Sequence, residues 1–333
     1  GQEKLTTAFL ETAWKYIGLA RRHRGQGKKN LRYYKDPVSL GGSRHTMVVD
    51  GLERVWVEYV PPCCTPDKEW PVVVTMHGRG GTADTFLDIS NLYQVANARR
   101  FIVVSPQAGV YQQKPKGLRN VLLWEGTLDG KAIDDVKFIR NLLEDLRSRV
   151  KVDRHRIYAC GQSSGGMMTD TLGQYASDIF AACVAWSGIN CPAMEYLHRD
   201  SLPYKMPTIV LYGDRDTLFG GADRVPGLPF PVATAFVPVV EERFRRDGLD
   251  KNNVDTWETY PITWYSYPNS QGVPMFVAGV VDNMVHANYP AESWISYDQY
   301  MAKFTRGDNG ELYYCGKLVE STKTATGPPS GGP

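Results

Sequence analysis

The segment that decides the fold runs from Arg156 to Met168 and reads RIYACGQSSGGMM. It begins with the apolar character of a buried strand and ends like the start of a helix. Gly161-Gln162-Ser163-Ser164-Gly165 lies at the junction and fits G-x-S-x-G, the pattern of a nucleophile elbow. Such a sharp turn projects a serine hydroxyl, and small residues on either side let the turn close. The pattern therefore predicts Ser163 as a catalytic nucleophile.

Strand-like and helix-like segments alternate around this junction, which favours a mostly parallel sheet with helices on both faces. Asp50-Gly51 predicts an antiparallel hairpin at one edge of that sheet. We expect one α/β domain over residues 37–326, with an insertion at about 217–260. Residues 1–36 are expected to form a basic helical segment packed on the domain, and 327–333 a flexible tail. The expected strands are 45–50, 52–60, 71–76, 101–105, 156–160, 181–187, 208–212 and 275–281. The expected helices are 134–150, 234–246 and those beginning near residues 164 and 290.

Composition and charge narrow the class of protein. The 333 residues are 42% hydrophobic and 22% charged, which is ordinary for a globular domain. The chain has no apolar run of about 18 residues, so we expect no membrane span. The formal net charge is +2, but residues 12–35 hold eight lysines and arginines and no acid. Such a segment is either a solvated helix end or a docking surface for an anion.

Six cysteines permit disulfides, and they suggest a secreted or periplasmic protein. The bonds expected in that case join Cys63 or Cys64 to Cys191 or Cys315. The cysteines form no C-x-x-C pair, so we expect no zinc site. No metal and no cofactor are predicted.

A serine nucleophile needs a base, and on a fold of this type the chain order is serine, acid, histidine. His286 follows the last expected strand and is the predicted base. The acid is expected after the strand that ends near Gly213, where spacing alone does not choose between Asp214 and Asp216. The more distant options are Asp223 and Asp282.

The developing oxyanion needs two backbone donors. One is the N–H of Ser164, next to the nucleophile. The other is expected in the glycine-rich turn His77-Gly78-Arg79-Gly80-Gly81, where the Arg79 N–H is the natural donor. His77 precedes Ser163 in the chain, so we interpret it as structural.

Four ordered blocks resemble a known family: MHGRGGTADTF (76–86), DDVKFIR (134–140), VDRHRIYACGQSSGGMMT (152–169) and YGDRDTLF (212–219). They are similar to the polyhydroxybutyrate depolymerase and feruloyl esterase-like group of α/β-hydrolases, over about residues 70–290. The resemblance implies an α/β-hydrolase fold and a serine hydrolase that forms an acyl-enzyme. It makes Ser163 the nucleophile, Asp216 the acid and His286 the base, with Arg79 and Ser164 as oxyanion donors.

The substrate is the least determined part of the prediction. Relatives of this kind cut polyesters, feruloyl or acetyl esters on polysaccharides, or in some cases poly(aspartic acid). Arg79 and the basic segment favour a depolymerase of an anionic polymer such as poly(aspartic acid). The alternatives are a polyhydroxybutyrate-type depolymerase or a feruloyl or acetyl esterase. A more remote alternative is a non-catalytic scaffold that binds an anionic partner.

Four side chains are predicted to contact the substrate: Arg79, Gln162, Trp124 and Trp264. The last belongs to an aromatic stretch at 257–267 that suits either a binding surface or a core. We expect a polymeric or ester substrate, which could be polyanionic, and no nucleic-acid partner. The sequence is compatible with a homodimer.

Overall fold

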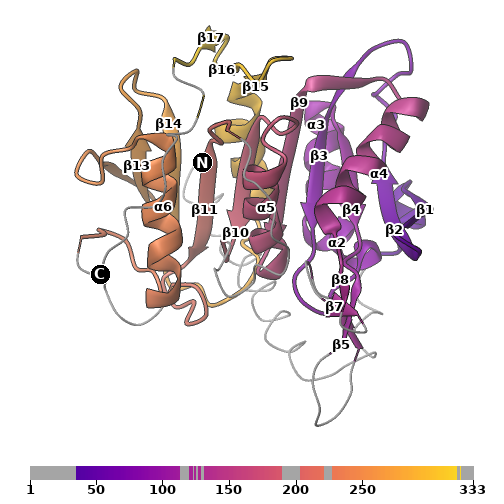
Figure 1. The fold of residues 1–333 in the computed structure, drawn as a ribbon, viewed down its shortest axis with the longest axis horizontal. Coiled ribbons are helices and arrows are strands. Elements are labelled where there is room, and N and C mark those ends of the chain that lie inside the picture. The colour runs from indigo at the N-terminus through magenta and orange to yellow at the C-terminus, as the bar shows by residue number, and fades with distance from the viewer. Residues whose placement is uncertain are drawn as a thin grey trace, which may run out of the picture.

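A ten-stranded sheet forms the centre of the computed structural model, with strand order β1-β2-β4-β3-β9-β10-β11-β14-β13-β12 (Figure 1). The structure describes residues 35–112, 120–122, 124, 127–128, 131–189, 203–220, 227–320 and 323. The strands are β1 (Ser43–Val49), β2 (Leu52–Tyr59), β3 (Trp70–Met76), β4 (Ile102–Pro106), β9 (Val152–Gln162), β10 (Ala182–Trp186), β11 (Thr208–Gly213), β12 (Asp255–Thr259), β13 (Ile262–Pro268) and β14 (Pro274–Val281).

The middle of the sheet is parallel, from β4 through β3, β9, β10 and β11 to β14. Parallel strands are typically buried on both faces, and β3 is an example. Val72 and Val74 point into one core and Val73 points into the other. The predicted β1–β2 hairpin lies at one edge, and Asp50 and Gly51 both have positive φ. The mostly parallel sheet predicted from the sequence is confirmed.

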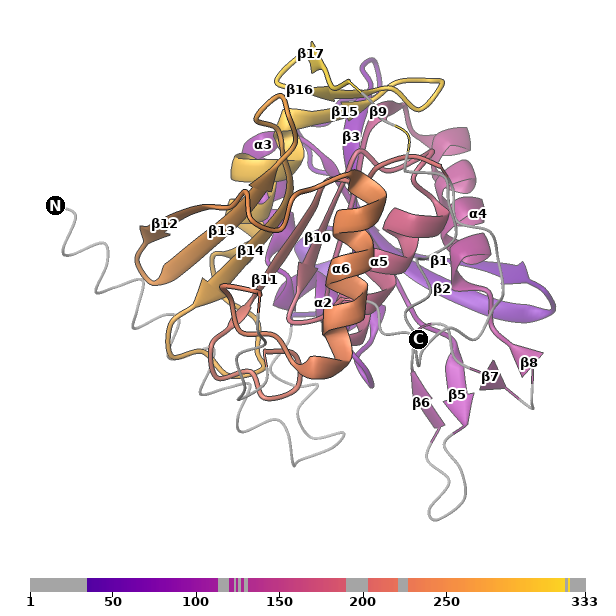
Figure 2. The same cartoon turned by 60° about the vertical axis from the view of Figure 1, so that its left-hand side comes forward.

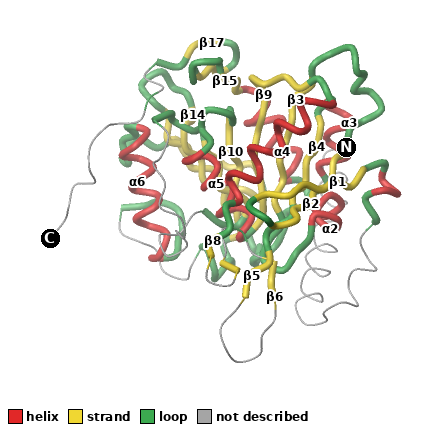
Figure 3. The backbone as a smooth tube through the Cα atoms, turned by 45° about the vertical axis from the view of Figure 1, so that its right-hand side comes forward, coloured by secondary structure: helices red, strands yellow, loops and turns green. Residues whose placement is uncertain are grey.

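Helices cover both faces of the sheet, as Figures 2 and 3 show. The cores place α4, α5 and α6 on one face and α2, α3 and the C-terminal helical segment on the other. The helices are α2 (Ala83–Ile89), α3 (Leu92–Arg99), α4 (Asp135–Arg149), α5 (Ser164–Tyr175), α6 (Val237–Asp247) and α7 (Glu292–Ile295), which continues as a π-helical turn (Ser296–Tyr300) and a 3₁₀ turn (Met301–Lys303).

The irregular stretch predicted at 217–260 lies between β11 and β14 and contains α6 and β12. The extra structure continues through β13, so a second antiparallel pair extends the edge of the sheet opposite to β1. Sequence analysis did not predict this pair. Two predicted segments lie outside the described residues: the basic segment as far as residue 34 and the tail at 327–333.

Short strands complete the described part of the chain. They are β5 (Val110–Gln112), β6 (Asn120–Leu122), β7 (Thr127–Leu128), β8 (Lys131–Ala132), β15 (Phe304–Arg306), β16 (Leu312–Tyr314) and β17 (Lys317–Leu318). Across the described residues, no helix has the length and apolar character needed to span a membrane.

The cysteines depart from the expectation. Cys63, Cys64 and Cys315 are free, as are the other two cysteines among the described residues. Cys63 Sγ donates to the Asn97 carbonyl at 3.6 Å, whereas Cys315 is exposed in the turn between β16 and β17. The predicted bond from Cys63 or Cys64 to Cys315 is therefore wrong. A bond to Cys191 stays a prediction, because Cys191 lies outside the described residues.

Candidate active site

The turn between β9 and α5 holds Ser163 in a conformation that few non-glycine residues adopt. Its φ is 58° and its ψ is −118°. The Ser163 N–H donates to the Trp186 carbonyl at 2.8 Å, and its own carbonyl accepts from the Met167 N–H at 3.0 Å. Neighbouring structure therefore fixes the elbow, as strained backbone at a functional site requires.

The two glycines of G-x-S-x-G are required by close backbone contacts. A Cβ on Gly161 would lie 2.4 Å from the Gly165 carbonyl oxygen. A Cβ on Gly165 would lie 2.0 Å from the Met76 carbonyl oxygen. Both contacts are with backbone atoms, which cannot rotate away, so the elbow closes only with glycine at these positions.

Three side chains predicted from the sequence form one chain of hydrogen bonds. Ser163 Oγ lies 2.8 Å from His286 Nε2, and His286 Nδ1 lies 2.8 Å from Asp216 Oδ2. The side chains come from the carboxyl ends of β9, β11 and β14, which lie at the same edge of the parallel sheet. This geometry lets the imidazole accept the serine proton while the carboxylate holds the other ring nitrogen.

The structure distinguishes between the two carboxylates after β11. Asp216 is fully buried, and its Oδ1 accepts from the backbone N–H groups of Leu218 and Phe219, each at 3.0 Å. Asp214 is largely exposed. Some loss of hydration, together with the nearby Asp282 carboxylate, raises the pKa of Asp214. Only Asp216 contacts His286 among the candidates that the structure describes.

A buried carboxyl group that sequence analysis missed organises the segment after His286. Glu292 is 2% exposed, and its two oxygens accept from Asn288 Nδ2 at 2.5 Å and from the Tyr289 N–H at 3.0 Å. Burial raises the pKa of Glu292 to about 8, although both hydrogen bonds oppose that rise. No capping-box pattern marks Glu292 in the sequence, because the residue three positions before it is Tyr289 rather than a Ser, Thr, Asp or Asn.

The glycine-rich turn after β3 lies directly over the nucleophile. A Cβ on Gly78 would lie 3.4 Å from Ser163 Cβ. His77 Nδ1 donates to the Gly78 carbonyl at 2.7 Å, and Nε2 accepts from the Ala108 N–H at 3.1 Å. Burial lowers the pKa of His77 to about 4, so its ring is neutral and can do both.

The two predicted oxyanion donors lie on segments that meet at Ser163. Arg79 directly follows Gly78 and is exposed. Ser164 is the first residue of α5. The first N–H groups of a helix have no partner within the helix, so the Ser164 N–H is free to face a developing negative charge. The oxyanion role of both groups remains a prediction.

Two of the four predicted substrate contacts are wrong because the side chains are buried. Trp124 is 2% exposed, and its indole N–H donates to the His77 carbonyl at 2.8 Å, so it supports the turn from behind. Trp264 is 3% exposed and belongs to a hydrophobic core. Gln162 is half-buried with its Oε1 against Gly78, and Arg79 is exposed, so their contact with substrate stays a prediction.

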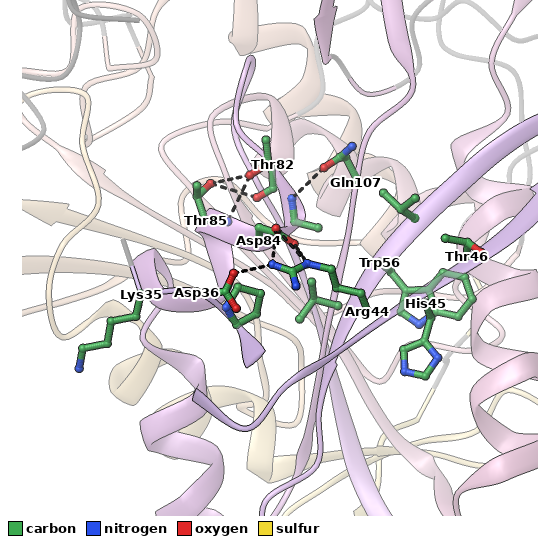
Figure 4. Close-up of a pocket in the computed structure, with 14 residues that line it drawn as sticks. Lys35, Asp36, Arg44, His45, Thr46, Trp56, Thr82, Asp84, Thr85 and Gln107 are labelled. Atoms are coloured by element: carbon green, nitrogen blue, oxygen red, sulfur yellow. Dashed lines mark hydrogen bonds and ion pairs between the residues drawn. The ribbon is translucent and has the colours of Figure 1, made fainter. Parts of the chain in front are cut away.

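A cavity of about 500 Å³ lies near the β1–β2 edge of the sheet, beside the start of α2 (Figure 4). Its main cation is Arg44, which pairs with Asp36 at 2.7 Å and with Asp84 at 2.8 Å. The described residues that line the cavity do not include those of the Ser163 hydrogen-bond chain. The cavity is therefore separate from the candidate active site.

Solved structures with a similar backbone arrangement identify the fold. An acetyl xylan esterase from Aspergillus awamori matches with a TM-score of 0.53 at 13% identity, covering 78% of this chain and 99% of that one. An S-formylglutathione hydrolase from Agrobacterium tumefaciens matches with a TM-score of 0.51 at 15% identity, covering 78% and 92%. The chain has the α/β-hydrolase fold.

Sequence relatives of this chain are named as esterases. A putative esterase, NocK, of Nocardia uniformis is 30% identical over 188 residues, which are 54% of this chain and 51% of the relative. A feruloyl esterase B of Thermothelomyces thermophilus is 29% identical over 123 residues, which are 37% of this chain and 40% of that one. The matches span about half or less of these relatives. No family model matches the chain.

Proposed function

We propose that this α/β-hydrolase is a serine esterase in which Ser163 is the nucleophile, His286 the general base and Asp216 the acid of a catalytic triad. The observation that carries the proposal is the pair of 2.8 Å hydrogen bonds that connects the three side chains. The strained Ser163 backbone and the enclosed Asp216 support it, because both fit a preorganised site.

The proposed reaction proceeds in two halves. His286 Nε2 takes the Ser163 proton as Oγ attacks the ester carbonyl carbon, and the carbonyl oxygen becomes an oxyanion that the N–H groups of Arg79 and Ser164 stabilise. The C–O bond to the alcohol then breaks, His286 returns the proton to that alcohol, and an acyl-Ser163 ester remains. Water, deprotonated by His286, attacks the acyl-enzyme and releases the carboxylic acid and free Ser163.

The substrate that we propose is an acetyl or feruloyl ester carried on a polysaccharide. The names of the relatives described above, a feruloyl esterase and an acetyl xylan esterase among them, point to ester bonds of this kind. Cleavage of poly(aspartic acid), the first expectation from the sequence, has no support in those names. A polyester of the polyhydroxybutyrate type stays the second candidate.

Hydrolysis of p-nitrophenyl acetate tests the proposal. The native protein should release p-nitrophenol, and Ser163→Ala should lower kcat at least ~10³-fold, as expected for loss of a triad nucleophile. Ser148→Ala, which changes an exposed serine at the end of α4, is the matched control and should retain full activity. A fluorophosphonate probe should label the native chain and the control but not Ser163→Ala. An inactive, unlabelled native protein would instead favour the non-catalytic scaffold.

A further inference from the structure

The edge of the sheet next to β13 carries an exposed tryptophan in an unusual setting. All five residues of β12, Asp255–Thr259, are exposed, because this strand has a neighbour on one side only. Trp257 is 44% exposed, whereas its register partner on β13, Trp264, is 3% exposed. One indole thus belongs to the core, and its partner lies on the surface directly outside it.

Packing fixes the orientation of the exposed ring. The Trp257 and Trp264 rings stack at a centroid distance of 6.1 Å with 17° between their planes. Trp264 is itself immobilised: its indole N–H donates to Thr259 Oγ1 at 2.6 Å, and its ring lies against Gly279, where a Cβ would be 2.6 Å away. Trp257 therefore rests on a rigid base as a flat aromatic surface, and little conformational entropy is lost when a ligand covers it.

The turn of the β12–β13 hairpin lies at the carboxyl end of β14, which is the end of the parallel strands that carries the proposed triad. The turn between β12 and β13 is Tyr260-Pro261, and the Pro261 carbonyl accepts from the Asp282 N–H at 2.7 Å. Asp282 follows the last residue of β14 and precedes His286 by four residues. Tyr260, in that turn, is 70% exposed. Figure 2 shows β12 and β13 at the outer edge of the sheet, beside β14.

Three carboxylates lie near these aromatic side chains. Asp255 lies two residues before Trp257 and shares its face of the strand, and Glu258 directly follows Trp257. Asp282 adds a carboxylate beside the turn. These carboxylates repel a polyanion, but they can accept hydrogen bonds from neutral hydroxyl groups. Charged side chains on an edge strand also oppose pairing with the edge of a second copy.

We propose that Trp257 and Tyr260 form an aromatic strip that binds a neutral polysaccharide chain whose acyl group reaches Ser163. A pyranose ring presents a flat C–H face that packs on an aromatic ring, while its hydroxyl edge donates to flanking carboxylates such as Asp255. A polyester offers no hydroxyl donors along its chain. The open, flat shape suits an extended polymer rather than a small acyl group, which needs an enclosing pocket. The inference rests on the proposed esterase function and specifies its substrate class.

Kinetics on two substrates of the same acyl group test the aromatic strip. Trp257→Ala and Tyr260→Ala should each raise KM for acetylated xylan about fivefold, the loss expected for one aromatic contact. Neither should change kcat/KM for p-nitrophenyl acetate, which is too small to reach the strip. Trp257→Phe should recover part of the xylan affinity. Leu318→Ala, at an exposed position on β17, is the control and should change neither substrate. Equal losses on both substrates, or an unchanged KM for xylan, would overturn the proposal.

A binding measurement separates this inference from the proposed activity. Ser163→Ala should be retarded by deacetylated xylan in a native affinity gel, and Ser163→Ala combined with Trp257→Ala should not. This result does not require turnover, so it tests the strip even if the native protein hydrolyses no ester. Free migration of Ser163→Ala through the xylan gel, or adsorption of the protein to polyhydroxybutyrate particles that depends on Trp257, would refute a carbohydrate occupant.

Discussion

Substitution of Glu292 by glutamine should change how the stability of the protein depends on pH. The Glu292 carboxyl is buried, and its pKa rises from an ordinary 4.5 to about 8 in the folded chain. Between these two values the folded state holds a proton that the unfolded state has released. Glu292 therefore contributes a stability that is complete below about pH 4.5 and is lost as the pH rises towards 8.

The magnitude follows from linkage. A group that is protonated in the folded state and ionised in the unfolded state lowers the free energy of unfolding by about 1.4 kcal/mol for each unit of pH. Across the interval from pH 4.5 to about 8, the loss accumulates to as much as about 5 kcal/mol. Glutamine does not titrate, so Glu292→Gln should remove this slope. Its amide also places an NH2 donor against the Asn288 or Tyr289 donor, whereas the hydroxyl oxygen of the protonated carboxyl can still accept. This should lower stability by about 1–3 kcal/mol at acidic pH.

Urea unfolding at about pH 5.5, 6.5 and 7.5 measures both effects. The native protein should be more stable than Glu292→Gln at the lowest of these pH values, and the difference should shrink or reverse as the pH rises. Other titrating groups affect both proteins equally and cancel in the comparison. Glu241→Gln, at an exposed position on α6, is the matched control and should follow the native curve. Stability curves for Glu292→Gln and the native protein that stay parallel across this range would refute the reasoning.

Three further predictions concern the site. The proposed triad requires Ser163 and His286 to act as a unit, so the kcat of the double Ser163→Ala, His286→Ala variant should lie within about tenfold of either single variant. Additive losses in steady-state assays would contradict the triad. Gly165→Ala should destabilise the fold by about 2–4 kcal/mol, because its Cβ would lie 2.0 Å from a β3 carbonyl oxygen. Urea unfolding measures this loss, and a native-like midpoint would be inconsistent with the close contact. Arg79→Ala should leave the kcat for p-nitrophenyl acetate within about threefold of native, since only the backbone of that residue is proposed to act; a much larger loss would assign the side chain a catalytic role.

Local chemistry explains why the elbow could be predicted from the sequence. The turn at Ser163 requires glycine at positions 161 and 165, and these requirements appear directly in the residue pattern. The position of His286 follows from the order of strands in the chain. The choice between Asp214 and Asp216 does not, because the two residues differ only in the direction of their side chains after β11. That direction is set by backbone donors at positions 218 and 219, whose placement depends on the folded loop.

The aromatic stretch before His286 shows what register adds to sequence. Trp257 and Trp264 are both flanked by polar or β-branched residues, and nothing in the residue types separates the buried ring from the exposed one. The antiparallel pairing of β12 with β13 makes them partners, and the pairing of β13 with β14 places only Trp264 over Gly279. The prediction of Trp264 as a substrate contact is therefore wrong because its ring lies in the core, and its register partner Trp257 lies on the surface instead.

The prediction of a polyanionic substrate rested on charge counted along the chain, and the comparisons do not support it. The expectation of a polyanion rested on Arg79 and on the basic residues before position 36, most of which lie outside the described residues. Fields of exposed charges fade beyond about 8–10 Å at physiological salt, so a ligand responds to the groups beside the site rather than to totals. On the side where β11, β14 and the β12–β13 hairpin meet, those groups are the carboxylates Asp214, Asp282 and Glu258 and the guanidinium of Arg215. Among these four groups the carboxylates outnumber the guanidinium, so a neutral, hydroxyl-bearing chain fits this surface better than a carboxylate polymer does.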